Sequence, residues 1–178
     1  GLRSPWRALL DHQGRYWVGD VGEDSHEEIN LITEPGQFFG WPYFEGTRCT
    51  IDDCSELDAE PPLISWTHEI TEPLILEDPL TEPTMGRVAY VGLEYEPNEF
   101  DPYAGLMDNR VIYGDICLGW VRAMLLGEDN QILEDGNIGH LPNATGWSQG
   151  PDGYIYVSTY GDCESFGEGE TLVPGKFF

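Results

Sequence analysis

Acidic side chains gather in one short stretch near the start of the chain, and their chemistry suits a hard cation. Five carboxylates fall between positions 20 and 28, at Asp20, Glu23, Asp24, Glu27 and Glu28. Carboxylate and carbonyl oxygens are the ligands that calcium prefers in proteins. Because the chain holds 33 acidic residues in all, such a cluster is also typical of a solvated acidic surface.

Two arginines stand out upstream of these acids because basic residues are rare in the chain. Arg3 and Arg7 are two of only 8 basic residues. A guanidinium presents a planar set of donors that suits a carboxylate or carbonyl partner. Arg3 is therefore a candidate for binding an anionic ligand. The alternative is a structural arginine that caps the edge of a sheet.

The four cysteines favour disulfides over a zinc site. An even count in a very acidic chain suggests an oxidising compartment. We expect a local disulfide between Cys49 and Cys54 and a second one between Cys117 and Cys163, although four cysteines allow three connectivities. Zinc is disfavoured because the spacings are not C-x-x-C and the histidines are scattered. Asn143 opens an Asn-Ala-Thr sequon, a candidate glycosylation site that fits an extracellular protein.

The charge balance excludes whole classes of function. The 178 residues carry a formal net charge of −25, so nucleic acids are repelled and docking on anionic lipid is disfavoured. No apolar run approaches the roughly 20 residues of a membrane span, and no G-x-S-x-G motif supports a serine hydrolase. The chain begins without Met and without a signal peptide, which we interpret as a mature or truncated product.

Short apolar runs bounded by turn residues predict strands along most of the chain. The runs are β-branched or aromatic, about 4–8 residues long, and occupy residues 15–19, 28–32, 87–91, 110–114, 119–126 and 154–158. No stretch keeps a helical apolar period over three turns, and 22 Gly and 13 Pro argue against long helices. The sequence therefore predicts an all-β protein.

An internal similarity bears on how these strands are arranged. Residues 10–20 resemble residues 150–158, since in each a turn with a glycine, Gly14 or Gly153, precedes an aromatic strand. The two glycines are separated by close to three times the roughly 40–50 residues of a propeller blade. A β-sandwich has strands at the same density, so this spacing alone leaves both folds open. Because a propeller needs roughly 4–8 blades, three blades would be part of a larger assembly.

The order of motifs in the opening segment resembles one protein family. GLRSPWR at 1–7 is followed by GDVG at 19–22, EEINLI at 27–32, FGWP at 39–42 and FEG at 44–46. This order closely resembles the glucose/sorbosone dehydrogenase family, which includes quinoprotein sugar dehydrogenases, aldose sugar dehydrogenases and hedgehog-interacting-protein-like proteins. Residues 111–119 and 150–157 are similar to later strands of the same family, so the resemblance spans most of the chain.

The resemblance implies a fold and a cofactor. Residues 1–178 would be the C-terminal part of a six-bladed β-propeller, supplying about three blades, with acidic, Pro-rich insertion loops at 47–83. Family enzymes bind pyrroloquinoline quinone (PQQ) with calcium at the mouth of the central channel. Arg3 matches the arginine that contacts the quinone carboxylates, and Ser4 stands beside it where the family usually has Asn.

The resemblance also implies two calcium sites. The cofactor's calcium would be held by the backbone carbonyls of Gly22 and Glu23, where side-chain identity matters little. A second, structural calcium would be held by the carboxylate of Glu28 and the backbone carbonyl of Phe39. Carboxylate and carbonyl oxygens together form a hard-cation site.

Departures from the family pattern limit what this chain does alone. The family's general base is a His in an earlier blade, and none of the four histidines here lies in that motif, so no catalytic residue is assigned. Trp120 occupies a position where the family has Arg.

The resemblance thus implies part of a secreted or periplasmic quinoprotein that oxidises a sugar hydroxyl. Its partners would be a sugar substrate and the missing N-terminal half of the propeller, from the same or another chain. The alternative is a non-catalytic extracellular module that binds another extracellular protein or serves a structural role. Neither a nucleic-acid partner nor a membrane span is expected.

Overall fold

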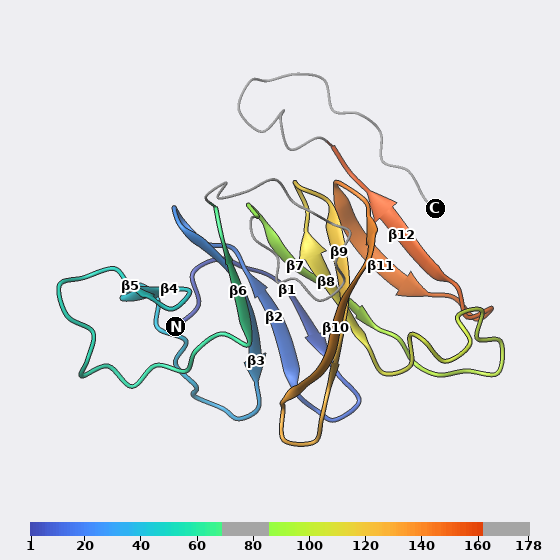
Figure 1. Ribbon diagram of the computed structural model, residues 1–178, viewed down its shortest axis with the longest axis horizontal. Helices are drawn as coiled ribbons and strands as arrows, with labels where there is room; N and C mark the ends of the chain where they lie inside the picture. The colour runs from blue at the N-terminus through green and yellow to red at the C-terminus, as the bar shows by residue number, and fades with distance from the viewer. Residues whose placement is uncertain (69–85, 162–178) are drawn as a thin grey trace. The chain divides into compact units, whose positions relative to one another are not determined.

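The computed structural model describes residues 1–68 and 86–161, and every regular element in them is a β-strand (Figure 1). The prediction of an all-β protein is confirmed. The described residues divide within β7 into two compact units, the first ending at Val91 and the second starting at Gly92. No helix in the described part of the chain is long and apolar enough to cross a membrane.

The first unit is built on a four-stranded antiparallel sheet with the order β1-β2-β3-β6. Its strands are β1 (Pro5–Leu10), β2 (Tyr16–Asp20), β3 (His26–Ile32) and β6 (Ile64–Thr67). A two-stranded ribbon of β4 (Phe44–Glu45) and β5 (Arg48–Cys49) lies in the connection between β3 and β6.

A buried aspartate explains why β1 and β2 form a hairpin. The carboxylate of Asp11 accepts hydrogen bonds from the backbone N–H of Arg15 (2.9 Å), from Nε of Arg15 (2.6 Å) and from Nε1 of Trp17 (2.9 Å). Burial would raise the pKa of Asp11, but the hydrogen bonds from Trp17 and Arg15 lower it below its ordinary value. Gly14 has a φ of 82°, which glycine adopts without strain. The ionised carboxylate therefore holds the turn.

One face of this sheet forms a core against the start of β7 (Ala89–Glu94). Trp17, Ile29 and Trp66 are buried there. A Cβ on Gly19 would lie 2.9 Å from the Cα of Tyr90, so only glycine permits this approach of two backbones.

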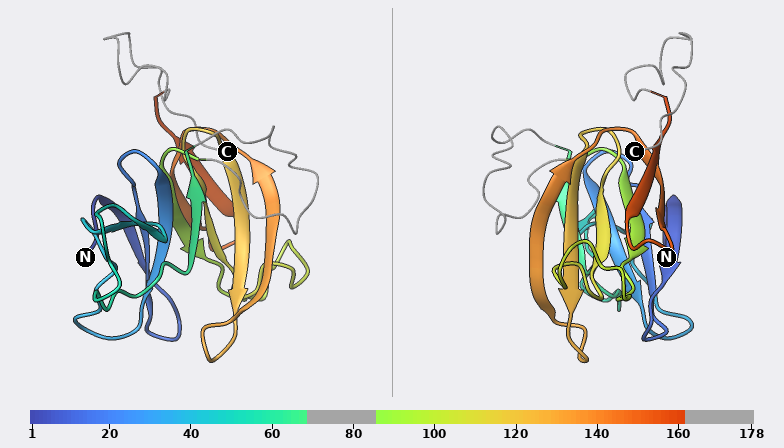
Figure 2. Two further views of the ribbon diagram at one scale, coloured as in Figure 1. Left: turned by 60° about the vertical axis from the view of Figure 1, so that its left-hand side comes forward. Right: turned by 90° about the vertical axis from the view of Figure 1, so that its right-hand side faces the viewer.

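The second unit contains a four-stranded antiparallel sheet with the order β10-β9-β8-β7 and a hairpin of two further strands. The strands that complete these sheets are β8 (Val111–Asp115), β9 (Trp120–Leu126), β10 (Ile132–His140), β11 (Ala144–Gln149) and β12 (Ile155–Thr159). β9 and β10 run side by side in both views of Figure 2, drawn in yellow and orange.

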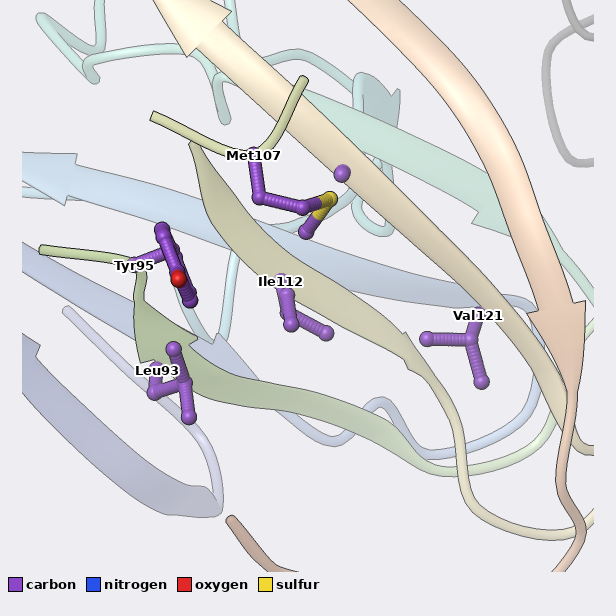
Figure 3. Close-up of a cluster of buried hydrophobic side chains, with 6 residues drawn as sticks. Leu93, Tyr95, Met107, Ile112 and Val121 are labelled. Carbon is purple, nitrogen blue, oxygen red and sulfur yellow. The ribbon is translucent and has the colours of Figure 1, made fainter. Parts of the chain in front are cut away.

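An apolar cluster on one face of this sheet forms the core of the second unit (Figure 3). Its buried members are Leu93, Tyr95, Met107, Ile112, Val121 and Ala123. Trp147 and Ile155, from the β11–β12 hairpin, pack against it. The hairpin is therefore fixed to the four-stranded sheet by side-chain packing.

Six predicted strands are confirmed as β2, β3, β7, β8, β9 and β12, with β7 starting at Ala89 instead of residue 87. The sequence did not predict the other six strands of the described residues, among them β1, which starts with Pro5, and β10, which holds two acids and two glycines. Two four-stranded sheets and a hairpin agree with the prediction of a partial propeller. Of the predicted insertion at 47–83, β5 and β6 lie in the described part, and residues 69–83 lie outside it.

Candidate functional site

The predicted cofactor residues meet where the chain enters β1 and leaves β2. The carboxylate of Asp20, at the end of β2, accepts hydrogen bonds from the backbone N–H groups of Arg3 (2.8 Å) and Ser4 (2.6 Å). Burial raises the pKa of Asp20 even though both hydrogen bonds oppose this. Asp20 thus fixes the backbone of the GLRSPWR segment beside the loop that carries Gly22 and Glu23.

The guanidinium of Arg3 contacts that same loop directly. Its Nη1 donates to the carbonyl oxygens of Gly22 (2.7 Å) and Val21 (3.2 Å), and its Nη2 lies 3.5 Å from Oε1 of Glu23. The guanidinium also lies 5.4 Å from the centre of the Trp41 ring. The Arg3 side chain is 29% exposed, so part of it remains accessible. The structure therefore brings Arg3, Ser4, Gly22 and Glu23 together.

Glu45 anchors this loop and was not assigned a role from the sequence. Its Oε1 accepts backbone N–H bonds from Glu23 (2.6 Å), Asp24 (2.9 Å), Ser25 (3.0 Å) and His26 (3.3 Å), and its Oε2 accepts from Oγ of Ser25 at 2.7 Å. Burial would raise the pKa of Glu45, but the bonds from Ser25, Glu23 and His26 lower it to about 2. The signal in the sequence was the FEG motif at 44–46.

Glu28 lies on the same face of the sheet as Asp20, because the two residues pair directly across β2 and β3. Its Oε1 accepts from the backbone N–H of Gly46 (2.6 Å) and its Oε2 from Nδ2 of Asn30 (2.9 Å). Burial, followed by the charges of Asp20 and Glu45, raises the pKa of Glu28 in spite of these bonds. Three buried carboxylates therefore influence one another here.

Asn30 leaves one oxygen of this group unsatisfied. Its side chain is fully buried, and its Oδ1 has no hydrogen-bond partner, while its Nδ2 holds Glu28. A buried amide oxygen without a donor is costly. An oxygen in this state beside a carboxylate of raised pKa fits the ligand chemistry of a hard cation.

The predicted calcium ligand Phe39 is connected to Glu28 through Gly46. Phe39 and Gly46 line a small cavity of about 140 Å³, and Gly46 is the residue that donates to Glu28. In the described residues, no group of three or more His, Cys, Asp or Glu side chains is arranged to hold a metal ion. A cation site here would depend on backbone carbonyl and amide oxygens as well, and the ligand assignments stay predictions.

The remaining predicted residues lie elsewhere. Cys49 and Cys54 form the expected disulfide, with their Cα atoms 5.9 Å apart. Cys117 is also disulfide-bonded, and its predicted partner Cys163 lies outside the described residues. Asn143 sits in the connection from β10 to β11 with a φ of 62°, and its glycosylation stays a prediction.

Solved structures with a similar fold are sugar dehydrogenases. The soluble aldose sugar dehydrogenase of Escherichia coli matches with a TM-score of 0.60 and 19% identity, over 89% of this chain and 42% of that chain. The PQQ-bound aldose sugar dehydrogenase of Streptomyces coelicolor matches with a TM-score of 0.57 and 14% identity, over 100% of this chain and 44% of that one. A putative glucose dehydrogenase of Thermus thermophilus matches with a TM-score of 0.59, 19% identity, and coverage of 98% and 44%.

The curated sequence relatives match this chain over only a small part of their own length. An uncharacterised protein of Synechocystis is 26% identical over 147 residues, which is 82% of this chain and 31% of that protein. The HIPL1 protein of Arabidopsis thaliana is 42% identical over 48 residues, or 26% of this chain and 7% of that protein. No family model matches the chain. The chain thus spans less than a third of the curated relatives it matches.

The fold therefore defines the class: this chain is part of a propeller of the kind found in soluble sugar dehydrogenases. The resemblance to the glucose/sorbosone dehydrogenase family is confirmed at the level of the fold, with the HIPL1 protein as a partial sequence relative.

Proposed function

We propose that this chain is part of a secreted, quinoprotein-like propeller that oxidises a sugar hydroxyl using PQQ and calcium. The observation that carries the proposal is the assembly of Arg3, Ser4, Gly22 and Glu23 at one corner, held by Asp20. Similar solved structures are sugar dehydrogenases, one of them PQQ-bound. A disulfide between Cys49 and Cys54 supports an oxidising compartment.

The residues at this corner fit a polycarboxylate cofactor. Arg3 would hold a carboxylate of the quinone through its exposed part, because Nη1 already donates to two carbonyl oxygens. Ser4 would add a hydroxyl beside it. When bound, the quinone supplies the acceptor for the two electrons of the sugar oxidation. This chain's own contribution is binding and orientation, since the predicted general base belongs to another part of the propeller.

The group around Glu28 fits a structural calcium. The cation would take the unsatisfied Oδ1 of Asn30 and a free lone pair of Glu28, and it would offset the mutual repulsion of Glu28, Asp20 and Glu45. The carbonyl of Phe39 would complete this part of the ligand set.

Titration of the full-length protein with PQQ tests the cofactor assignment. With calcium present, we expect saturable quenching of tryptophan fluorescence, and Arg3→Ala should weaken binding at least tenfold. Arg87→Ala is the matched control, because Arg87 is an exposed arginine that precedes β7, and the start of β7 packs on the face of the sheet opposite to Asp20. Addition of aldoses with an artificial electron acceptor then tests oxidation. Absence of PQQ binding by a folded protein would reject the proposal.

A non-catalytic module is the second candidate, and three observations favour it. Arg3 donates to the carbonyl of Gly22, which is one of the two predicted ligands of the cofactor's calcium. Ser4 replaces the usual Asn, and Trp120 is buried against the ring of Tyr113 where the family has Arg. In this case the partner would be an extracellular protein, and Arg3→Ala would lower stability without any change in response to PQQ.

A further inference from the structure

The loop between β2 and β3 closes around the carboxylate of Glu45. Three consecutive backbone N–H groups, those of Glu23, Asp24 and Ser25, lie 2.6, 2.9 and 3.0 Å from its Oε1. Glu45 is only 6% exposed. Successive N–H groups that converge in this way form a nest for an anion. A Cβ on Gly22 would lie 1.7 Å from a carbonyl oxygen at the start of β3, so only glycine permits this closure.

The carbonyl groups of the loop point away from Glu45 as a consequence. A trans peptide group is planar, and its N–H and C=O point in opposite directions. Each N–H that donates to Glu45 therefore turns the carbonyl of the preceding residue to the other side of the loop. The carbonyls turned in this way are those of Gly22, Glu23 and Asp24. The first two are the predicted ligands of the cofactor's calcium.

A positive group already lies on the carbonyl side of the loop. Nη1 of Arg3 donates to the carbonyl oxygens of Gly22 (2.7 Å) and Val21 (3.2 Å). The peptide group between Gly22 and Glu23 thus has a carboxylate at its N–H end and a guanidinium at its C=O end. The carboxylate strengthens the carbonyl oxygen as an acceptor, because linked hydrogen bonds polarise one another. A carbonyl oxygen has two lone pairs, so it can accept from Arg3 and bind a cation together.

We propose that Glu45 is a positioning residue for the cofactor's calcium, because it turns the carbonyls of Gly22 and Glu23 toward the cation and strengthens them as ligands. The positioning role rests on the proposed function, in which these two carbonyls bind calcium. Glu45 acts through the peptide groups and does not bind the cation itself, since Oε1 accepts from the loop and Oε2 accepts from Oγ of Ser25 at 2.7 Å. A neutral amide in its place should therefore weaken calcium binding although every ligand atom is retained.

A purely structural role for Glu45 is the alternative, and Asp11 provides the matched control. The carboxylate of Asp11 is also buried in the first unit, and it accepts from the backbone N–H groups of Gln13 (3.0 Å) and Arg15 (2.9 Å). It holds the turn between β1 and β2, which carries none of the predicted calcium ligands. Asp11→Asn should therefore destabilise the protein and leave its calcium affinity unchanged.

Calcium titration of the full-length protein, followed by HNCO NMR spectra, tests the proposal. One cross-peak joins the carbonyl carbon of Gly22 to the N–H of Glu23, so it reports on both ends of that peptide group. We expect a saturable calcium shift of this carbon, with a dissociation constant raised about tenfold or more in Glu45→Gln and unchanged in Asp11→Asn. Equal constants in the wild type and Glu45→Gln would overturn the proposal, as would an equal rise in both variants. A wild-type carbon that does not shift with calcium would overturn it too.

A milder substitution keeps the test decisive if Glu45→Gln does not fold. Ser25→Ala removes the hydroxyl donor to Oε2 and leaves the carboxylate charged, so the dissociation constant should rise by a smaller factor. An unchanged constant in this variant would contradict positioning by Glu45. The titration needs no PQQ. Calcium binding that depends on Glu45, without any binding of PQQ, would reject the proposed cofactor and support the positioning role. Binding of calcium and PQQ that is insensitive to Glu45→Gln would do the reverse.

Discussion

The two four-stranded sheets bury polar groups in opposite ways. In the first unit, Asp20, Glu28 and Glu45 are all buried, and burial, followed by the charges of Asp20 and Glu45, raises the pKa of Glu28. In the second unit, Asp135 on β10 accepts hydrogen bonds from Tyr113 and from Nε and Nη2 of Arg122. The second group is balanced by a guanidinium. The first is an excess of carboxylates held by N–H donors.

This difference assigns different roles to the two groups: the group around Asp135 supports the fold, and the group around Glu28 is suited to binding a cation. A buried carboxylate paired with arginine and tyrosine is satisfied by the protein itself and mainly fixes structure. A buried excess of carboxylates with an unsatisfied amide oxygen, Oδ1 of Asn30, gains from a cation. The comparison predicts that the first sheet responds to pH and calcium while the second does not.

The largest expected effect comes from breaking the balanced group. Arg122→Met leaves Asp135 buried without its positive partner, since the side chains of Arg122 and Asp135 are only 6% and 14% exposed. We expect a loss of about 3–5 kcal/mol in the free energy of unfolding, measured by urea titration. Adding Asp135→Leu should recover much of this loss, because it removes the uncompensated charge. A double variant no more stable than the single one would contradict this account.

Glu45 should give the next largest effect, and it should depend on pH. Its pKa falls from 4.5 unfolded to about 2 folded, so its contribution is fully present above pH 4.5 and is lost as pH falls toward 2. At neutral pH this contribution is at most about 3 kcal/mol. Glu45→Gln should therefore lower the melting temperature at pH 7 and much less at pH 3. A difference that is independent of pH would show that the charge of Glu45 is not what holds the loop.

Some strands of the fold could be predicted from their residue types, and others could not. Strands rich in Val, Tyr and Trp, such as β2 and β9, follow from propensity and turn signals. β10, with the sequence ILEDGNIGH, has no clean alternation, and only pairing with β9 makes it a strand.

The site was predictable only where a motif marked it. Arg3, Gly22 and Glu28 came from the resemblance, and their proximity needed the fold. Glu45 could not be assigned, because its donors come from a loop about 20 residues earlier in the chain. Glu27 and Glu28 are adjacent, yet they point to opposite faces of β3, where Glu27 binds His68 and the backbone N–H of Ala89. Sequence alone does not say which of the two faces Asp20.

The disulfide should have a smaller effect. Cys49 and Cys54 close a loop of few residues, so the chain-entropy model gives at most about 2 kcal/mol. Replacing both by Ser should lower the melting temperature modestly. It should also make the position of the Glu45 side chain less fixed, because Cys49 pairs with Phe44, the residue before Glu45. Comparing the double variant in the wild-type and Glu45→Gln backgrounds measures this coupling. Strict additivity would mean that the loop and the carboxylate act independently.

The smallest change in the calcium-free protein should come from Glu28→Gln, and it should be stabilising. The folded pKa of Glu28 is raised, above all by burial, so its ionised form is disfavoured as pH rises from 4.5 through the folded value. The introduced amide oxygen can still accept from Gly46, and its N–H₂ can donate to Oδ1 of Asn30 once the Asn30 amide turns over. We therefore expect a slightly higher melting temperature than wild type above the folded pKa, and no difference below pH 4.5. Calcium should reverse the order, because it raises the wild-type melting temperature and leaves the variant unchanged. Differential scanning fluorimetry with calcium and with chelator measures both signs. A wild-type protein indifferent to chelation would remove the cation from this site, and the excess of buried carboxylates would then need another explanation.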